Sequence, residues 1–303
     1  PVKDIQRVPG GPISKLDPNG QFMIEQMYVQ YFLPKVRRGK YPLLMWHGGG
    51  LTGVSYESTP DGREGWMNLF IRKGWDTYVS DAVERGRSGF ASPDVWSDTP
   101  IFLNYQDPFE RFRIGAGAGS WNADPAKRKP MPGSQFPVDA YDNYMKQSVP
   151  RWLSTDQAIM DAYLALVDKV CPCVLLLHSQ GGTFGFQVAE QRPDKIKAIV
   201  AVESASAGKV ANAPKLKNIP VMLMFGDYVD EHPRWPPTRR SIPNTATPSR
   251  RPAARSSLRF PMTVAASTRT RYGRRRSSVG CFLSAARWPA GNCSSCCSLR
   301  RSR

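Results

Sequence analysis

Short apolar runs recur along the first 240 residues of the chain, and each is followed by a glycine, a proline or a polar residue. The runs are rich in Val, Ile, Leu and Met, and the one at residues 27–33 alternates between apolar and polar positions. Both patterns are typical of β-strands. We therefore predict strands at residues 27–33, 42–46, 76–80, 174–178, 196–202 and 219–225.

Between several of these runs, apolar residues recur at the three- and four-residue spacing of an amphipathic helix. Residues 61–74 follow this spacing and end at a glycine, which is a common helix C-terminus. Residues 153–170 keep their apolar side chains on one face, and residues 183–190 open a third helix. Because helices alternate with strands, the sequence predicts an α/β fold whose mostly parallel sheet has helices on both faces.

The periodicity is lost at about residues 91–150, where prolines, glycines and aromatic residues accumulate. This segment is too long for a simple connection between two elements. We interpret it as a cap insertion over one end of the sheet, with aromatic side chains that line an apolar pocket. The alternative is that these side chains only pack the cap onto the rest of the fold. They are Trp96, Phe102, Tyr105, Phe109, Phe112, Trp121, Phe136 and Tyr141.

Residues 241–303 have a different composition, with 13 arginines and no lysine, aspartate or glutamate. They supply +13 of the net charge of +17, so residues 1–240 carry only +4. Most of the excess positive charge therefore lies in the tail. The same charge spread over a folded domain would favour a nucleic-acid partner. We expect one α/β domain at 1–240 and an aberrant, frameshifted or disordered arginine-rich tail at 241–303.

The tail composition is typical of a coding sequence translated in the wrong frame. If the last base of each codon is joined to the first two bases of the next, residues 260–270 permit the peptide PDDGGGINSH. One of its aspartates is forced by the methionine codon. The histidine that this shift would restore matters because the chain has only three, His47, His178 and His232. An arginine-rich arm that binds nucleic acid or an acidic partner is the alternative interpretation.

Other composition features narrow the classes of function. The chain has no run of 18 apolar residues, so we expect no membrane-spanning helix. It starts at Pro1 without a secretory segment, so it is either exported and already trimmed or a fragment, and the compartment stays open. The CSSCC sequence at residues 293–297 resembles half a zinc site, but the tail has no histidine to complete it. We expect no metal and no cofactor.

The most specific motif is VLLLHSQGG at residues 174–182, in which an apolar strand leads directly to Ser179. We interpret it as a nucleophile elbow, where a strained turn between strand and helix raises the serine hydroxyl above the sheet. Leu177 stands where the usual GxSxG pattern has its first glycine, so the motif is a variant. An ordinary turn between a strand and a helix is the alternative.

Acyl transfer by a serine needs a base, an acid that orients the base, and N–H donors for the developing oxyanion. The sequence HGGG at residues 47–50 follows an early strand. We expect the backbone N–H of Gly49 to form the oxyanion hole together with that of Gln180, the residue after the nucleophile. A flexible turn is the alternative role for HGGG. Two acids follow predicted strands, Glu203 and Asp227, and spacing alone favours neither.

These motifs resemble those of α/β-hydrolases, and within them those of a small group of bacterial esterases. That group combines an HSQ elbow, an HG-loop that continues into LTG, and a glutamate after the strand that follows the nucleophile. The matching pieces here are HGGGLTG at residues 47–53, HSQ at residues 178–180, and Glu203. The resemblance covers about residues 20–240. Where the group has two cysteines in the HG-loop, this chain has Gly49 and Gly50.

The resemblance implies an α/β-hydrolase fold with Ser179 as nucleophile, Glu203 as the acid, and Gly49 with Gln180 at the oxyanion hole. It also implies a histidine base in an Asn-Ser-His context near the C-terminus, and this chain has no histidine there. The triplet is the one that the shifted frame would restore.

None of the three histidines present is a good substitute for that base. His47 precedes the oxyanion loop, His178 adjoins the nucleophile, and His232 follows the last predicted strand. We therefore expect a serine-dependent hydrolase of small-molecule carboxylic esters, acting through an acyl-enzyme and impaired by the missing base. The alternative is a non-catalytic protein of hydrolase fold with a basic arm. The ester, its acyl length and the oligomeric state stay open.

Overall fold

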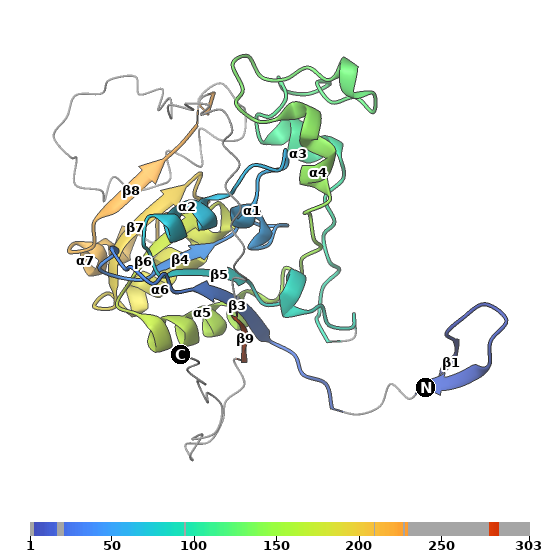
Figure 1. The fold of residues 1–303 in the computed structure, drawn as a ribbon, viewed down its shortest axis with the longest axis horizontal. Helices are drawn as coiled ribbons and strands as arrows, with labels where there is room; N and C mark the ends of the chain where they lie inside the picture. Colours follow the sequence, from blue (N-terminus) through green and yellow to red (C-terminus); the bar gives the residue numbers. More distant parts are fainter. Residues whose placement is uncertain are drawn as a thin grey trace.

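A seven-stranded mixed sheet forms the centre of the molecule (Figure 1). The computed structural model describes residues 3–16, 21–93, 95–208, 210–226, 228–229 and 279–284. The sheet contains β3 (Gln26–Phe32), β4 (Leu43–Trp46), β5 (Thr77–Asp81), β6 (Cys173–His178), β7 (Ile196–Val202), β8 (Val221–Met224) and β9 (Val279–Ser284). Their order across the sheet is β8-β7-β6-β4-β5-β3-β9.

Most of the neighbouring strands run parallel, as the alternation of strands and helices predicts. The pairs β4·β5, β4·β6, β6·β7 and β7·β8 are parallel, and β3 is antiparallel to both β5 and β9. All six predicted strands are present, within a few residues of the expected bounds. The carboxyl ends of β6 and β7 therefore lie side by side, which brings the residues after them together.

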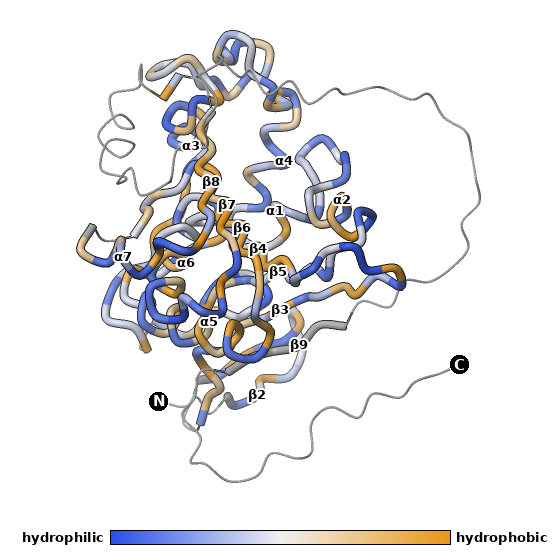
Figure 2. The backbone as a smooth tube through the Cα atoms, turned by 90° about the vertical axis from the view of Figure 1, so that its left-hand side faces the viewer, coloured by the Kyte–Doolittle hydropathy of each residue, from blue (hydrophilic) through white to orange (hydrophobic). Residues whose placement is uncertain are grey.

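Helices cover both faces of the sheet, because successive strand residues point to opposite sides. Leu44 and Trp46 pack on one face with α5 (Asp156–Val170) and α6 (Gln180–Gln191). Leu43 and Met45 pack on the other face with residues of α1 (Val54–Glu57) and α2 (Trp66–Arg72). Figure 2 shows the hydrophobic residues, in orange, gathered along the central strands. The predicted α/β fold with helices on both faces is confirmed.

Three helices begin at other residues than the periodicity predicts. Helix α5 begins at Asp156, not at residue 153. Helix α2 begins at Trp66, not at residue 61, because Ser58 and Glu64 pair in a short antiparallel bridge that closes the preceding turn. Helix α6 begins at Gln180, not at residue 183, because the chain passes from β6 into the helix with Ser179 as the only residue between them.

The segment at residues 91–150 forms short elements that lie outside the layers of sheet and helices (Figure 1). They include α3 (Gln106–Arg111), α4 (Tyr141–Met145) and the 3₁₀ turns Pro125–Lys127 and Val138–Ala140. The segment has a small core of its own, made of Phe109, Ile114, Tyr141 and Met145. It is called the cap below.

Several elements were not expected from the sequence. A separate two-stranded sheet pairs β1 (Lys3–Gln6) with β2 (Ile13–Leu16), and α7 (Ala213–Leu216) precedes β8. Within the arginine-rich tail, which the sequence predicts to be frameshifted or disordered, β9 pairs with the edge of β3, with Val29 opposite Cys281. Residues 230–278 and 285–303 lie outside the described part of the chain. They include most of the basic arm, residues 260–270 on which the predicted frameshift rests, and the CSSCC sequence.

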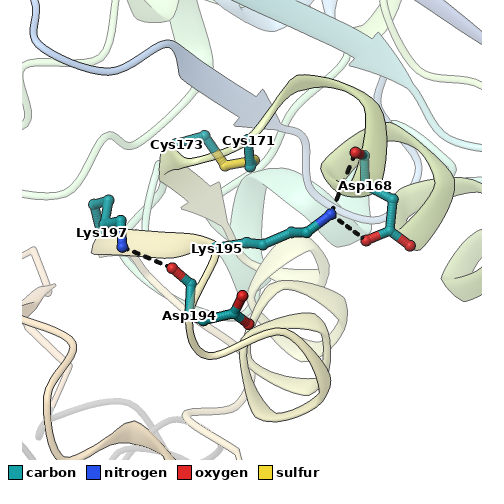
Figure 3. The surroundings of a disulfide bond; sticks show 6 residues. All are labelled: Asp168, Cys171, Cys173, Asp194, Lys195 and Lys197. Carbon is teal, nitrogen blue, oxygen red and sulfur yellow. Dashed lines mark hydrogen bonds and ion pairs between the residues drawn. A yellow bond between two sulfur atoms is a disulfide. The ribbon is translucent and has the colours of Figure 1, made fainter.

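A disulfide joins Cys171 and Cys173 where α5 gives way to β6 (Figure 3). Close to it, Lys195 donates to the Oδ1 of Asp168 at 2.7 Å and so ties the end of α5 to the start of β7. Arg192 pairs with the same carboxylate, Nε to Oδ1 at 2.9 Å. These contacts fix the end of β6 that lies opposite Ser179.

Among the described residues, no helix has both the length and the apolar character that a membrane crossing requires. The longest, α5, has 15 residues and carries its buried side chains on one face.

Candidate active site

Ser179 occupies a strained position between β6 and α6. Its φ of 49° and ψ of −115° lie in a region that residues with a side chain rarely adopt. Its N–H donates to the carbonyl of Val202 at 3.1 Å, and its carbonyl accepts from the N–H groups of Gly182 and Ala205 at 2.9 and 3.0 Å. These three bonds hold the turn in its strained form. Ser179 itself is half-buried and lines a cavity.

The glycines after Ser179 allow the helix to approach its neighbours. A Cβ on Gly181 would lie 2.6 Å from the carbonyl oxygen of Trp46, and one on Gly182 would overlap the hydroxyl of Ser204. A glycine in the helix also explains why Leu177 can replace the first glycine of the usual motif. Its side chain fills the space beside Gly185, one turn into α6, where a Cβ would overlap it.

The HGGG loop lies directly against the serine. A Cβ on Gly48 would lie 3.1 Å from the Cβ of Ser179, and one on Gly49 would lie 3.0 Å from the Oε1 of Gln180. Within the described residues, the N–H groups of Gly49 and Gln180 have no hydrogen-bond acceptor. Because Gln180 is the first residue of α6, its N–H has no partner inside the helix.

An ion pair between the buried Asp81 and the half-buried Arg87 supports the loop. The N–H of Gly53 donates to Asp81 at 2.8 Å, and Arg87 donates to the same carboxylate from its Nε and Nη2 at 2.8 and 2.9 Å. Burial opposes the charge on Asp81, but the hydrogen bonds from Arg87 outweigh it and lower the pKa of this carboxyl. Arg87 also pairs with Glu57 at 2.8 Å. These contacts anchor the loop at Gly53.

His47 is fully engaged in the same support. Its Nε2 accepts the N–H of Ala82 at 2.9 Å, so its Nδ1 carries the proton and donates to the carbonyl of Gly48 at 2.8 Å. Burial lowers the pKa of His47 to about 4, which keeps the ring neutral. His47 therefore holds the loop and has no nitrogen left to act as a base.

Glu203 follows β7 and also has a left-handed backbone, with φ of 48°. Its Oε1 accepts the N–H of Gly226 at 2.5 Å and the Nη2 of Arg113, a cap residue, at 2.7 Å. Within the described residues its Oε2 accepts no hydrogen bond. The side chain of Glu203 is 28% exposed and that of Arg113 is 9% exposed, so the pair lies at the wall of the cavity.

A cavity of about 470 Å³ lies between the cap and the end of the sheet. Ser179, Glu203 and Gly49 line it together, which places the predicted nucleophile, acid and oxyanion loop at one site. Its other wall is mainly aromatic. The aromatic lining residues are Tyr56, Trp66, Phe112, Phe136 and Tyr144.

The eight cap aromatics expected at a pocket have different positions. Phe112 and Phe136 line the cavity, whereas Phe109 and Tyr141 are buried in the small core of the cap. The others pack against a core or are exposed: Trp96 against the main core, Trp121 against the cap core, and Phe102 and Tyr105 toward solvent. Both interpretations of the aromatic cluster therefore hold, each for part of it.

No family model matches the chain, but a solved structure and a curated protein are similar to it. A solved structure of a bacterial esterase is 32% identical to it, covers 80% of this chain and 77% of its own, and has a TM-score of 0.63. The chain belongs to the α/β-hydrolase superfamily. A curated relative named "Probable secreted lipase phiG", from Fungal sp. (strain ATCC 74256), is 30% identical to the hydrolase over 61% of the chain and 51% of the relative. The hydrolase spans about half the length of that protein.

Three site features of this α/β-hydrolase were not found from its sequence. Arg113, Asp81 and Arg87 are distant in the sequence from the candidate motifs, and only the fold brings them to the site. The sequence ERGRSG at residues 84–89 gives no sign that Arg87 binds a buried carboxylate.

Two questions from the sequence concern residues of the hydrolase that the structure does not describe. Asp227, the other candidate acid, and His232 both lie outside the described residues. His178 is described. Its Nδ1 lies 2.8 Å from the position of a Cβ on Gly48, so its ring is under the oxyanion loop, and burial lowers its pKa.

Proposed function

We propose that this α/β-hydrolase cleaves carboxylic esters through an acyl-enzyme formed on Ser179. The observation that carries the proposal is the strained turn at Ser179, which is open to an apolar cavity and lies beside two N–H groups that have no acceptor among the described residues. The names of the similar proteins, a bacterial esterase and a probable lipase, support an ester as the substrate.

In the proposed reaction, the Oγ of Ser179 attacks the ester carbonyl and gives up its proton to a base. The carbonyl oxygen becomes negative and accepts hydrogen bonds from Gly49 and Gln180, which are in place before the reaction starts. The bond to the alcohol oxygen then breaks, and the alcohol leaves with the proton. Water repeats the sequence on the acyl-enzyme and releases the acid.

Glu203 is the acid in this proposal. Its Oε1 is held by Gly226 and Arg113, so its Oε2 is the oxygen that can accept a hydrogen bond from a base. Among the described residues, neither histidine forms a hydrogen bond with Glu203 or with the Ser179 side chain. Both nitrogens of His47 are engaged, and His178 lines the cavity with its Nδ1 against Gly48. We therefore propose that the chain as it stands is an impaired esterase.

The test is hydrolysis of p-nitrophenyl butyrate by the chain and by Ser179→Ala. Enzymes that lack one member of a serine triad retain a rate about 10³–10⁴-fold above water, from the oxyanion hole and substrate binding. We expect kcat of about 10⁻² s⁻¹ or less, compared with about 10 s⁻¹ for a typical enzyme. After the hydrolysis that imidazole itself causes in buffer is subtracted, added imidazole should raise the rate in the chain and not in Ser179→Ala, because it supplies a base beside Glu203.

Two results would contradict the proposal. Hydrolysis that is unchanged in Ser179→Ala would exclude this serine as the nucleophile. Normal turnover that Ser179→Ala abolishes would show that the chain has a base, and His232→Ala would then show whether His232 provides it.

A further inference from the structure

The lining of the cavity indicates which substrates fit, because aromatic side chains line the cavity from two sides. Tyr56 and Trp66 come from α1 and α2 of the main fold, while Phe136 and Tyr144 come from the cap. A volume of about 470 Å³ is within the range of sites that bind drug-sized ligands, about 300–1,000 Å³. The acyl group of an acetate ester would leave most of this space unfilled.

The aromatic walls are held in position before any ligand arrives. The rings of Phe136 and Tyr144 meet edge to face, with centroids 5.6 Å apart and planes at 86°. The hydroxyl of Tyr56 donates to the carbonyl of Trp46 at 2.9 Å. Burial raises the pKa of Tyr144 to about 12, so its phenol stays neutral at ordinary pH. Rings fixed in this way can receive another ring in the offset or edge-to-face geometry that aromatic groups prefer.

The charge of the lining favours a neutral ligand. Arg113 and Glu203 are the charged side chains of the lining, and they pair with each other at 2.7 Å. A carboxylate or an ammonium on the substrate would have to compete with this pair, or lie unpaired against the aromatic wall, which costs free energy. Neither charge is therefore left over to recognise a charged substrate.

We infer that the cavity takes an ester with a neutral aromatic ring on one side of the ester linkage, of the size of a phenylacetate. The inference rests on the proposed function for the reaction itself. Beyond the reaction, we expect Trp66 and the Phe136–Tyr144 pair to bind the aromatic ring of the substrate. This contact selects aryl esters over short alkyl esters and over charged esters.

Calorimetric titration of the Ser179→Ala variant tests the inference, because this variant binds an ester without cleaving it. The probes are ethyl phenylacetate, ethyl cyclohexylacetate, ethyl acetate and the monoethyl ester of malonic acid. Ethyl phenylacetate should bind tenfold or more tighter than ethyl acetate, since it buries a ring. It should bind about three- to tenfold tighter than the cyclohexyl ester, since an aromatic pair adds to the effect of area. The anionic malonate ester should bind most weakly.

Matched variants on the Ser179→Ala background connect the preference to the wall. Phe136→Leu and Trp66→Leu should each reduce the preference for the phenyl over the cyclohexyl ester to about twofold or less. Trp66 is 38% exposed, so its replacement does not threaten the fold. Phe102→Leu is the control, because Phe102 is a cap aromatic that is 68% exposed and outside the lining.

Equal binding of the three neutral esters would overturn the inference. So would a preference for the phenyl over the cyclohexyl ester that is unchanged in both Phe136→Leu and Trp66→Leu. Tightest binding of the malonate ester would also overturn it. Binding to Ser179→Ala involves no chemistry, so these results are independent of the esterase proposal. That proposal fails separately, if release of p-nitrophenol does not depend on Ser179.

Discussion

At the scale of single residues, the backbone of Ser179 stores strain that its side chain cannot relieve. With φ at 49°, glycine fits this position without strain and any other residue costs of order 1–3 kcal/mol. We therefore expect Ser179→Gly to unfold with a free energy about 1–2 kcal/mol higher than Ser179→Ala, measured by urea denaturation.

The same pair of substitutions at Ser58 is the control. The φ of Ser58 is −148°, an ordinary extended conformation, so alanine should be at least as stable as glycine there. If Ser179→Gly is no more stable than Ser179→Ala, the turn is not strained and the case for a nucleophile elbow is weakened.

His47 should make stability depend on pH. Burial lowers its pKa from 6.5 to about 4, so between these values the unfolded chain binds a proton that the folded chain does not. The contribution of the neutral His47 to the free energy of unfolding is fully present above pH 6.5. As the pH falls from 6.5 toward 4, the free energy of unfolding decreases by about 3 kcal/mol on this account. Urea denaturation from pH 7 to pH 4 measures the loss.

In His47→Gln this pH-dependent loss should be reduced, although the variant is less stable at pH 7. Asp81 does not confuse the measurement, because its lowered pKa moves its own loss of stability below pH 4. An unchanged slope between pH 7 and pH 4 in His47→Gln would show that His47 titrates normally in the folded protein.

The motif residues could be predicted because each follows a strand that the sequence also predicts. Ser179, Glu203 and the HGGG loop follow β6, β7 and β4, and parallel strands bring these ends together. Arg113 could not be predicted in this way. It lies 90 residues before Glu203, in a segment without periodicity, and its pairing depends on how the cap folds back.

At the scale of elements, predictability depended on length and burial. The central strands and α5 repeat apolar residues often enough to reveal their period, and they were found. The cap helices have only five or six residues, and β1 and β2 have four each with mixed polarity, too few to show a period. Their formation depends on tertiary contacts such as the core around Phe109.

The disulfide at the start of β6 is expected to stabilise the fold only a little. It closes a loop of three residues, and the entropy that a crosslink removes from the unfolded chain grows with loop length. The double variant Cys171→Ser, Cys173→Ser should lose about 1–2 kcal/mol of unfolding free energy, and dithiothreitol should have the same effect on the unmodified chain. A loss above about 4 kcal/mol, or an effect of the reductant on the double variant, would contradict this account.

At the scale of the whole molecule, the cap is tied to the main fold at residues of the candidate site. Val149 donates to the carbonyl of Gly50 in the oxyanion loop at 2.9 Å, and Arg113 pairs with Glu203 at 2.7 Å. The position of the cap and that of the proposed acid are therefore coupled.

Replacement of Arg113 should affect cap and chemistry together. In Arg113→Met we expect trypsin to cleave the cap several-fold faster near Lys127, and the Ser179-dependent ester hydrolysis with imidazole to fall about tenfold. Arg113→Lys should restore part of the resistance to trypsin and part of the hydrolysis rate. Lysine keeps the positive charge but lacks the planar guanidinium group.

Arg63→Met provides the control, because Arg63 forms an exposed ion pair with Asp61 outside the cap. It should leave both measurements unchanged. Hydrolysis that is unaffected in Arg113→Met would mean that Gly226 alone orients Glu203.

The contact between Leu177 and Gly185 has a consequence for recognising such proteins in genomes. The usual signature has a glycine two positions before the serine. Here that position is Leu177, and the glycine that makes room for it is Gly185, six positions after the serine. A search that accepts a small residue at either place would recover hydrolases that the five-letter signature overlooks. It also follows that exchanging the two positions, with glycine at 177 and leucine at 185, is the pair of changes that a protein engineer could expect this elbow to tolerate.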